Sequence, residues 1–265
     1  MKNNSTLAAV LLLAMGLTLF SCGSSHKSSG GSGACSASSN FCLLPTSCKK
    51  PVTFTDPFLK AAVISSFVDS GDTAFLSGDT IYNQAFCDVY TLTLDSDSIT
   101  SLGGLENAIY AVSIDLSNNS ISDLTPLSNL VYLQSLLLND NNISSIDKLS
   151  NLKALEVLGL DDNNVTDISP LAGMKYLAIL SLDGNSGLSN IATLSGLHQL
   201  NQIYLDDDNI SSLLPLYDNA YLGNGDDLYI ENNPLSQISC CTYITALVNN
   251  NVTVDDSGSC AYSCP

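Results

Sequence analysis

Apolar residues recur along the middle of the chain at a fixed interval instead of in separate helical or strand-like blocks. From Leu133 to Leu152 they follow the order L-x-x-L-x-L-x-x-N-x-I-x-x-I-x-x-L-x-x-L, and the order starts again 22 residues later at Leu155. Other copies begin at Val89, Ala111, Leu177, Leu200 and near Gly225, which gives about seven. One unit of this length cannot bury its own leucines, so stacked units must share a continuous core.

Each position of the unit predicts a piece of structure. Segments such as Leu136-Leu137-Leu138 alternate between two faces and predict short parallel strands. The Ile and Leu positions that follow at three-residue spacing fit a tight 3₁₀-like return. The slot after each strand predicts an inward amide that satisfies backbone groups of neighbouring coils; it holds Asn119, Asn141, Asn163 and Asn185. Asp97 and Asp208 occupy the same slot, so we expect those two coils to be less regular.

The two ends of the repeat region carry the signals of covering elements. Asp56 is placed to N-cap a helix that starts at Pro57, and Leu59, Val63 and Phe67 then form its apolar stripe. After the repeats, Ile244, Leu247 and Val248 suit a short covering helix, and residues 251–254 suit a last strand.

These segments resemble bacterial leucine-rich repeat proteins of the internalin-like, 22-residue class. The resemblance rests on the repeats, on VTFTDPFLKAAV at 52–63, on SLGGLENA at 101–108 and on ISDLTPL at 121–127, and it covers about residues 52–254. It implies an α/β fold: a right-handed leucine-rich repeat solenoid with a parallel sheet on the concave face, 3₁₀ and loop segments on the convex side, and a helical N-terminal cap. It also implies binding of other proteins, with no catalytic residue to carry over.

The cysteines gather at the two ends of the chain's repetitive body. Those before the repeats are Cys35, Cys42, Cys48 and Cys87, and those after them are Cys240, Cys241, Cys260 and Cys264. We expect two disulfides at each end and none across the repeats. Adjacent Cys240 and Cys241 are poorly placed to join each other, so each is expected to pair with Cys260 or Cys264. A metal site is the alternative, but neither cluster has paired C-x-x-C spacing.

The N-terminal residues predict a targeting segment. A basic start and an apolar run from Leu7 to Phe20 precede Leu19-Phe20-Ser21-Cys22, which resembles a bacterial lipobox with Cys22 as the lipidated residue. The alternative is an ordinary secretion signal cut nearby. Removing Cys22 leaves eight cysteines, an even number suited to an oxidising compartment. We therefore expect a signal peptide at 1–21, a Ser/Gly tether at 22–40, a cysteine-containing helical cap at 41–88, repeats at 89–239 and a C-terminal cap at 240–265, displayed at the bacterial outer membrane or cell surface.

Charge and composition exclude several functions. Acidic residues outnumber basic ones 26 to 8, a formal net charge of −18, so nucleic acid and anionic membrane surfaces are disfavoured as partners. The chain has two histidines and no tryptophan, and His26 lies in the Ser/Gly tract. Imidazole catalysis and multi-histidine metal sites are therefore disfavoured. We expect no cofactor, no resident metal, no membrane contact other than the lipid anchor, and a monomer.

The outward-pointing strand positions supply a candidate binding face. Its apolar and aromatic members are Leu137, Val157, Ile179, Tyr204 and Tyr229, and its acidic members are Asp161, Asp183 and Asp206. Apolar and aromatic groups beside charge are typical of protein interfaces, and the carboxylates favour a partner with a basic surface. Three alternatives are a structural spacer, acid–base catalysis by Asp161 and Asp183, and calcium between the aspartate columns.

Overall fold

The computed structural model describes residues 50–69, 76–77, 80–87, 89–95, 98–257 and 259–260. The chain divides into two compact units, residues 1–48 and 49–265, and every described residue belongs to the second. The expected signal peptide, tether and lipidation site at Cys22 lie outside the described residues, as do Cys35, Cys42, Cys48, Asp97 and Cys264.

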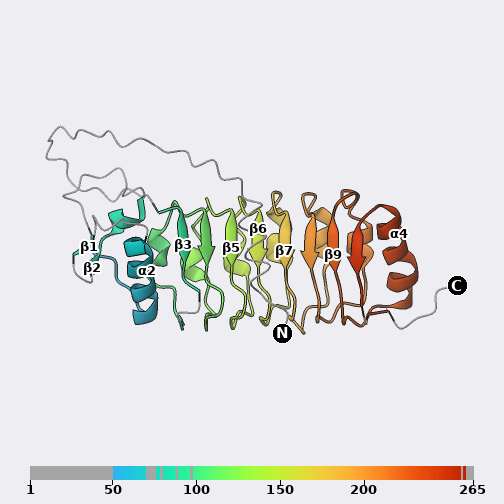
Figure 1. The fold of residues 1–265 in the computed structure, drawn as a ribbon, viewed down its shortest axis with the longest axis horizontal. Coiled ribbons are helices and arrows are strands. Elements are labelled where there is room, and N and C mark those ends of the chain that lie inside the picture. The colour runs from blue at the N-terminus through green and yellow to red at the C-terminus, as the bar shows by residue number, and fades with distance from the viewer. Residues whose placement is uncertain are drawn as a thin grey trace. The chain divides into compact units, whose positions relative to one another are not determined.

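Eight short strands form one fully parallel sheet in which each strand pairs with the next along the chain. Figure 1 shows them side by side in a single row between a helix at each end. The strands are β3 (Thr91–Thr93), β4 (Ser113–Asp115), β5 (Ser135–Leu137), β6 (Val157–Gly159), β7 (Ile179–Ser181), β8 (Gln202–Tyr204), β9 (Asp227–Tyr229) and β10 (Thr253–Asp255). The leucine-rich repeat solenoid predicted by the 22-residue period is confirmed.

The chain returns from each strand to the next through short helical turns. They are η4 (Leu105–Asn107), η5 (Thr125–Leu127), η6 (Asp147–Leu149), η7 (Ser169–Gly173) and η8 (Ala192–Gly196), all 3₁₀, and a four-residue α-helix α3 (Leu214–Tyr217). One repeat leucine in each turn is fully buried, for example Leu149 and Leu171. The repeat leucines thus form a continuous core along the solenoid, which is the packing that the period requires.

An asparagine ladder links successive coils beneath the strand ends. The Asn141 Oδ1 accepts the Ile121 N–H at 2.9 Å, and its Nδ2 donates to the carbonyls of Leu116 and Leu138 at 3.0 and 3.1 Å. Asn119, Asn163, Asn185 and Asn233 form equivalent bonds in their coils. The predicted inward amides are confirmed. They satisfy backbone groups that water cannot reach.

Asp208 interrupts this ladder, as its carboxylate predicts. It is buried, and neither carboxylate oxygen accepts a hydrogen bond of good geometry. The preceding coil contains one extra residue, and the Leu188 N–H donates to the Asn185 carbonyl at 2.7 Å instead of to position 208. Burial, together with the nearby charges of Asp183 and Asp161, raises the pKa of Asp208 to about 8, although the nearby backbone N–H of Asn185 opposes the shift.

A second column of polar residues is fixed by backbone conformation. Asn118, Asp140, Asp162, Asp207 and Asn232 all have φ between 51° and 58°, and Gly184 has φ 75°. Asn, Asp and Gly are the residues that tolerate this left-handed region. The acidic character of this column therefore follows in part from the turn geometry after each strand.

Helix α2 (Pro57–Asp69) covers the first coil. The Asp56 Oδ1 accepts the Phe58 and Leu59 N–H groups at 2.8 and 3.2 Å, which is the predicted N-cap. Its Oδ2 accepts the Thr100 N–H at 2.7 Å, so the same carboxylate ties the helix to the repeats. The predicted apolar stripe of Leu59, Val63 and Phe67 is fully buried. A two-stranded hairpin of β1 (Leu76–Ser77) and β2 (Thr80–Ile81) and the 3₁₀ turn η3 (Asn83–Cys87) complete this end.

The far end is closed by a π-helical turn, η9 (Ser239–Tyr243), that continues into α4 (Ile244–Asn249), followed by β10. Leu247 is buried as predicted, but Val248 is 50% exposed. The prediction for Val248 is wrong, because adjacent helical residues point in different directions and Leu247 takes the inward one.

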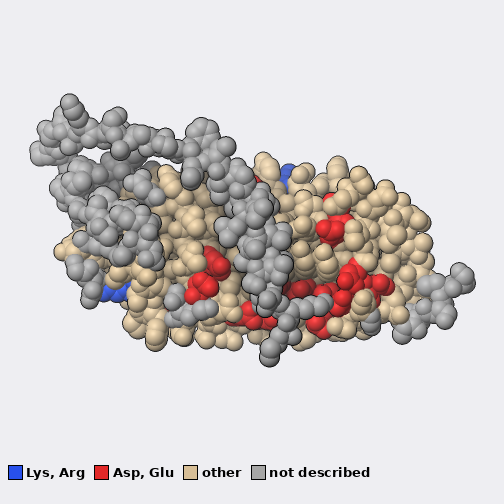
Figure 2. All heavy atoms as spheres, viewed as in Figure 1, with Lys and Arg blue, Asp and Glu red and all other residues tan. Residues whose placement is uncertain are grey.

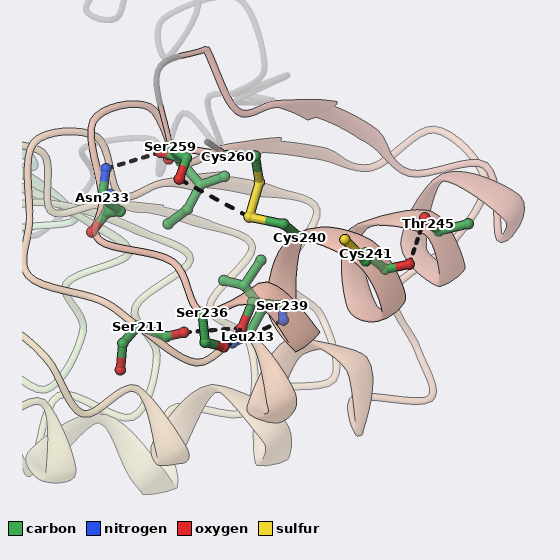
Figure 3. Close-up of a disulfide and its surroundings, with 11 residues drawn as sticks. Ser211, Leu213, Asn233, Ser236, Ser239, Cys240, Cys241, Thr245, Ser259 and Cys260 are labelled. Carbon is green, nitrogen blue, oxygen red and sulfur yellow. Dashed lines mark hydrogen bonds between the residues drawn. A yellow bond between two sulfur atoms is a disulfide. The ribbon is translucent and has the colours of Figure 1, made fainter. Parts of the chain in front are cut away.

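A disulfide joins Cys240 in η9 to Cys260 beyond β10 and staples the closing helix to the last strand (Figure 3). This is one of the two pairings expected for Cys240. Cys87 and Cys241 are disulfide-bonded as well. Their pairing lies outside the described residues, so the joining of Cys241 to Cys264 stays a prediction.

Candidate binding face on the parallel sheet

The strand register places the outward residues in straight columns across the sheet. The residues that begin each strand align from Ser135 through Val157, Ile179 and Gln202 to Asp227. The residues that end each strand align from Leu137 to Tyr229, through Gly159, Ser181 and Tyr204. The structure therefore brings the candidate aromatic and apolar residues onto one face.

Tyr204 and Tyr229 form a parallel stacked pair on β8 and β9. Their ring centroids are 4.6 Å apart and the ring planes differ by 2°. Both side chains are partly exposed. Burial, with smaller contributions from the nearby Tyr229 and Asp227, raises the pKa of Tyr204 to about 12. The pair is thus an uncharged apolar surface with two hydroxyl groups at its margin, which is the kind of surface that anchors partners at interfaces.

The aliphatic candidates differ in accessibility. Leu137 is partly exposed, whereas Val157 and Ile179 are 5% and 7% exposed. Gly159 leaves no side chain in the column between Leu137 and Ser181. A larger residue would not fit there, because its Cβ would lie only 2.6 Å from the Asn139 Oδ1. Leu137 and the tyrosine pair, more than the other two aliphatic residues, present accessible apolar surface.

Side-chain oxygens of one amide and three carboxylates form a ladder, here called the rim ladder, made by Asn139, Asp161, Asp183 and Asp206. Each side chain accepts the backbone N–H of the equivalent residue in the next coil, at 3.0 Å for Asn139, 3.1 Å for Asp161, 2.8 Å for Asp183 and 2.6 Å for Asp206. Figure 2 shows the Asp and Glu side chains of this face gathered mainly on its lower half, over the later coils. The repeat pattern predicts the column but not these bonds, because only the stacked register reveals which backbone N–H faces each side chain.

Burial and mutual repulsion make two members of the rim ladder, Asp161 and Asp183, easy to protonate. Burial raises the pKa of Asp161 to about 6, although the Ser181 hydroxyl donates to it at 2.5 Å and opposes the shift. Burial and then the charge of Asp161 raise the pKa of Asp183 to about 8. The repulsion expected between neighbouring aspartates is therefore partly relieved by bound protons near neutral pH.

Three further features bear on function. A hollow of about 350 Å³ lies between the last coil and α4, lined by groups that include Tyr217, Leu222 and Asn250. Within the described residues, no three His, Cys, Asp or Glu side chains are grouped so as to hold a metal ion. In the same part of the chain, none of the helices is long and apolar enough to span a membrane.

The fold and this face define a leucine-rich repeat solenoid with an aromatic and acidic sheet surface. A family model described as leucine-rich repeats (two copies) matches residues 132–173. An internalin (InlF) of Listeria monocytogenes has 26% sequence identity and a TM-score of 0.66 over 76% of this chain and 55% of its own. An internalin C2 of the same organism has 27% identity and a TM-score of 0.57 over 78% of this chain and 98% of its own.

The chain is thus similar to bacterial internalins, and it spans about half the length of the first of these structures. No curated protein sequence matches the chain.

Proposed function

We propose that this chain is a lipid-anchored protein of the bacterial cell surface that binds a protein partner with a basic surface through its sheet face. The observation that carries the proposal is the stacked pair of Tyr204 and Tyr229 beside the rim ladder. The similarity to internalin structures supports a recognition role for the solenoid.

The chemistry of the face fits Lys and Arg side chains. Aromatic rings attract cations through their faces, and the carboxylates of Asp183, Asp206 and Asp227 lie close enough to the pair to influence the tyrosine pKa values. A basic partner surface would also stabilise the ionised rim ladder and release its protons. Binding is therefore expected to strengthen as the pH rises from about 6 to about 8.

A structural spacer is the second candidate function. It would favour a uniformly small and polar sheet face, as the first coils have at Thr91, Thr93 and Ser113. The mixture of aliphatic, aromatic and acidic residues over the later coils supports recognition instead.

Changing Asp161, Asp183 and Asp206 together to Asn tests electrostatic steering. Asn139 already accepts the Asp161 N–H at 3.0 Å in this column, so amides preserve the rim ladder while removing its charge. We expect slower association with a basic partner, a weaker salt dependence and no strengthening of binding between pH 6 and 8. Association rates measured across salt and pH series check this.

The matched control removes three charges from the return segments by changing the exposed residues Asp123, Asp147 and Asp167 to Asn. It is expected to leave the pH dependence intact. If both triple variants slow association equally, the net charge of the chain sets the association rate. The proposal that carboxylates of the sheet face steer the partner would then be wrong.

The anchor is tested by Cys22→Ala. We expect the wild-type chain to fractionate with membranes and to carry lipid on Cys22, and the variant to be released or left unprocessed. Intact-mass analysis of the mature protein checks this. An unmodified N-terminus beyond residue 22 would indicate an ordinary secretion signal.

A further inference from the structure

A row of exposed tyrosines follows the turns that lead into the strands, away from the concave columns. Equivalent backbone hydrogen bonds close these turns: the Leu133 N–H donates to the Leu130 carbonyl, and the Leu177 N–H donates to the Met174 carbonyl. The residue before the buried position in successive turns is Tyr110, Tyr132, Ala154, Tyr176, Gln199 and Tyr221. We call these residues the turn row.

The exposed rings of the turn row recur at every second coil. Tyr132, Tyr176 and Tyr221 are 57%, 65% and 64% exposed, and they precede β5, β7 and β9. Ala154 and Gln199 hold the intervening places. Because neighbouring strands lie about 4.8 Å apart, successive rings of the row lie about 10 Å apart along the solenoid.

Two of these rings are braced from one side. Tyr132 stacks on Tyr110 with centroids 5.9 Å apart, and Tyr221 stacks on His198 with centroids 4.1 Å apart. Stacking limits their rotamer freedom, so less entropy is lost when a ligand packs on them. Solvent-exposed apolar rings held in this way are typical of a binding surface and unusual for a solubilising edge.

In the four middle turns of the turn row, those of Tyr132, Ala154, Tyr176 and Gln199, the chemistry is neutral to basic, although the chain as a whole is strongly acidic. The adjoining turn positions are Val131, Lys153, Lys175 and His198, and exposed amides stand beside them at Asn129, Asn151 and Gln199. Segments 128–133, 150–155, 172–177 and 195–200 contain no carboxylate, whereas the equivalent segments at the two ends of the row, 106–111 and 217–222, contain Glu106 and Asp218. Amides donate and accept hydrogen bonds without requiring a charged partner.

We propose that the turn row binds an extended, neutral β-1,4-linked polysaccharide. In such a chain successive sugars are rotated by half a turn, so the same apolar sugar face recurs once per disaccharide, close to the spacing of the exposed rings. Tyrosine rings pack on these apolar faces, while the amides and the phenol groups meet the hydroxyls. The row of three rings matches about three disaccharides. The site lies outside the sheet face and does not depend on the protein-binding function proposed above.

The test measures binding of the purified full chain to chitin and cellulose oligosaccharides of two to six sugars. We expect affinity for at least one series to rise with length up to the hexasaccharide. The double change of Tyr132 and Tyr176 to Ser is expected to weaken hexasaccharide binding at least tenfold. As a matched control, Tyr90→Ser removes a tyrosine that is 49% exposed but lies outside the turn row, and it is expected to bind like the wild type.

Three outcomes would overturn the proposal. The first is no binding of either neutral hexasaccharide. The second is equal binding by the double variant and the wild type. The third is binding of anionic heparin oligosaccharides alone, abolished when Lys153 and Lys175 are changed to Gln. The Tyr132→Ser/Tyr176→Ser variant leaves the sheet face intact, so it should still bind a protein partner through that face. Loss of polysaccharide binding alone therefore concerns the turn row and not the proposed protein-binding function.

Discussion

Asp208→Asn is expected to stabilise the protein by about 2 kcal/mol near pH 7.5, because a buried polar group without a partner costs about 1–3 kcal/mol. The Leu138 and Leu160 carbonyls each accept two side-chain amides of the asparagine ladder. In the described repeats, the Leu182 and Leu205 carbonyls on either side of Asp208 each accept one. An amide at position 208 is placed to supply the missing bonds and complete the ladder.

The increase in the free energy of unfolding caused by Asp208→Asn is expected to become larger as the pH rises. The pKa of Asp208 is about 8 in the folded protein, whereas an unfolded aspartate has a pKa near 3.9. Between these values the folded chain holds a proton that the unfolded chain has released, so stability falls as the pH rises from about 4 to about 8. Asn does not titrate. The difference between variant and wild type should therefore be smallest near pH 4 and grow up to about pH 8.

Urea unfolding at a series of pH values measures this effect, and a melting temperature raised by about 6 °C at pH 7.5 is the simplest sign of it. Asp207→Asn is the matched control, since it removes the same charge from an exposed neighbour. A similar gain in both variants would mean that reduced net charge, rather than the interrupted ladder, limits stability.

Replacing Tyr204 and Tyr229 together with Ala is expected to weaken binding of a basic protein partner at least 100-fold. Truncating an aromatic anchor to Ala costs about 2 kcal/mol of binding free energy. The lower affinity should result mainly from faster dissociation. Both rings are partly exposed, so the fold should remain intact. Dissociation rates measured with an identified partner, together with unchanged thermal unfolding, check the prediction.

The pair of changes Tyr204→Phe and Tyr229→Phe provides the control. It retains the stacked rings, whose centroids are 4.6 Å apart, but removes the hydroxyls. We expect most of the affinity to survive. If the Ala variant folds normally and binds with unchanged affinity, the sheet face is not the binding surface.

The sequence by itself determined the architecture. A leucine that recurs every 22 residues can be buried only by stacking, so the strands, the returns and the continuous core follow from the period. The inward amides of Asn141 and Asn163, the N-cap at Asp56 and the weak point at Asp208 also follow, because each depends on a residue type at a known position of the repeat. These features are local or periodic, and a periodic pattern can be recognised in the sequence without the structure.

Only the tertiary structure decided how neighbouring coils meet. It showed that Asp161 and Asp183 accept backbone N–H groups from the next coil, and that the rings of Tyr204 and Tyr229 are parallel. It also turned Val248 outward and selected Cys260 as the partner of Cys240. Each of these outcomes depends on register, rotamer and helix rotation between segments about 20 residues apart. A linear pattern gives the column in which a residue stands, but packing decides which atoms it faces.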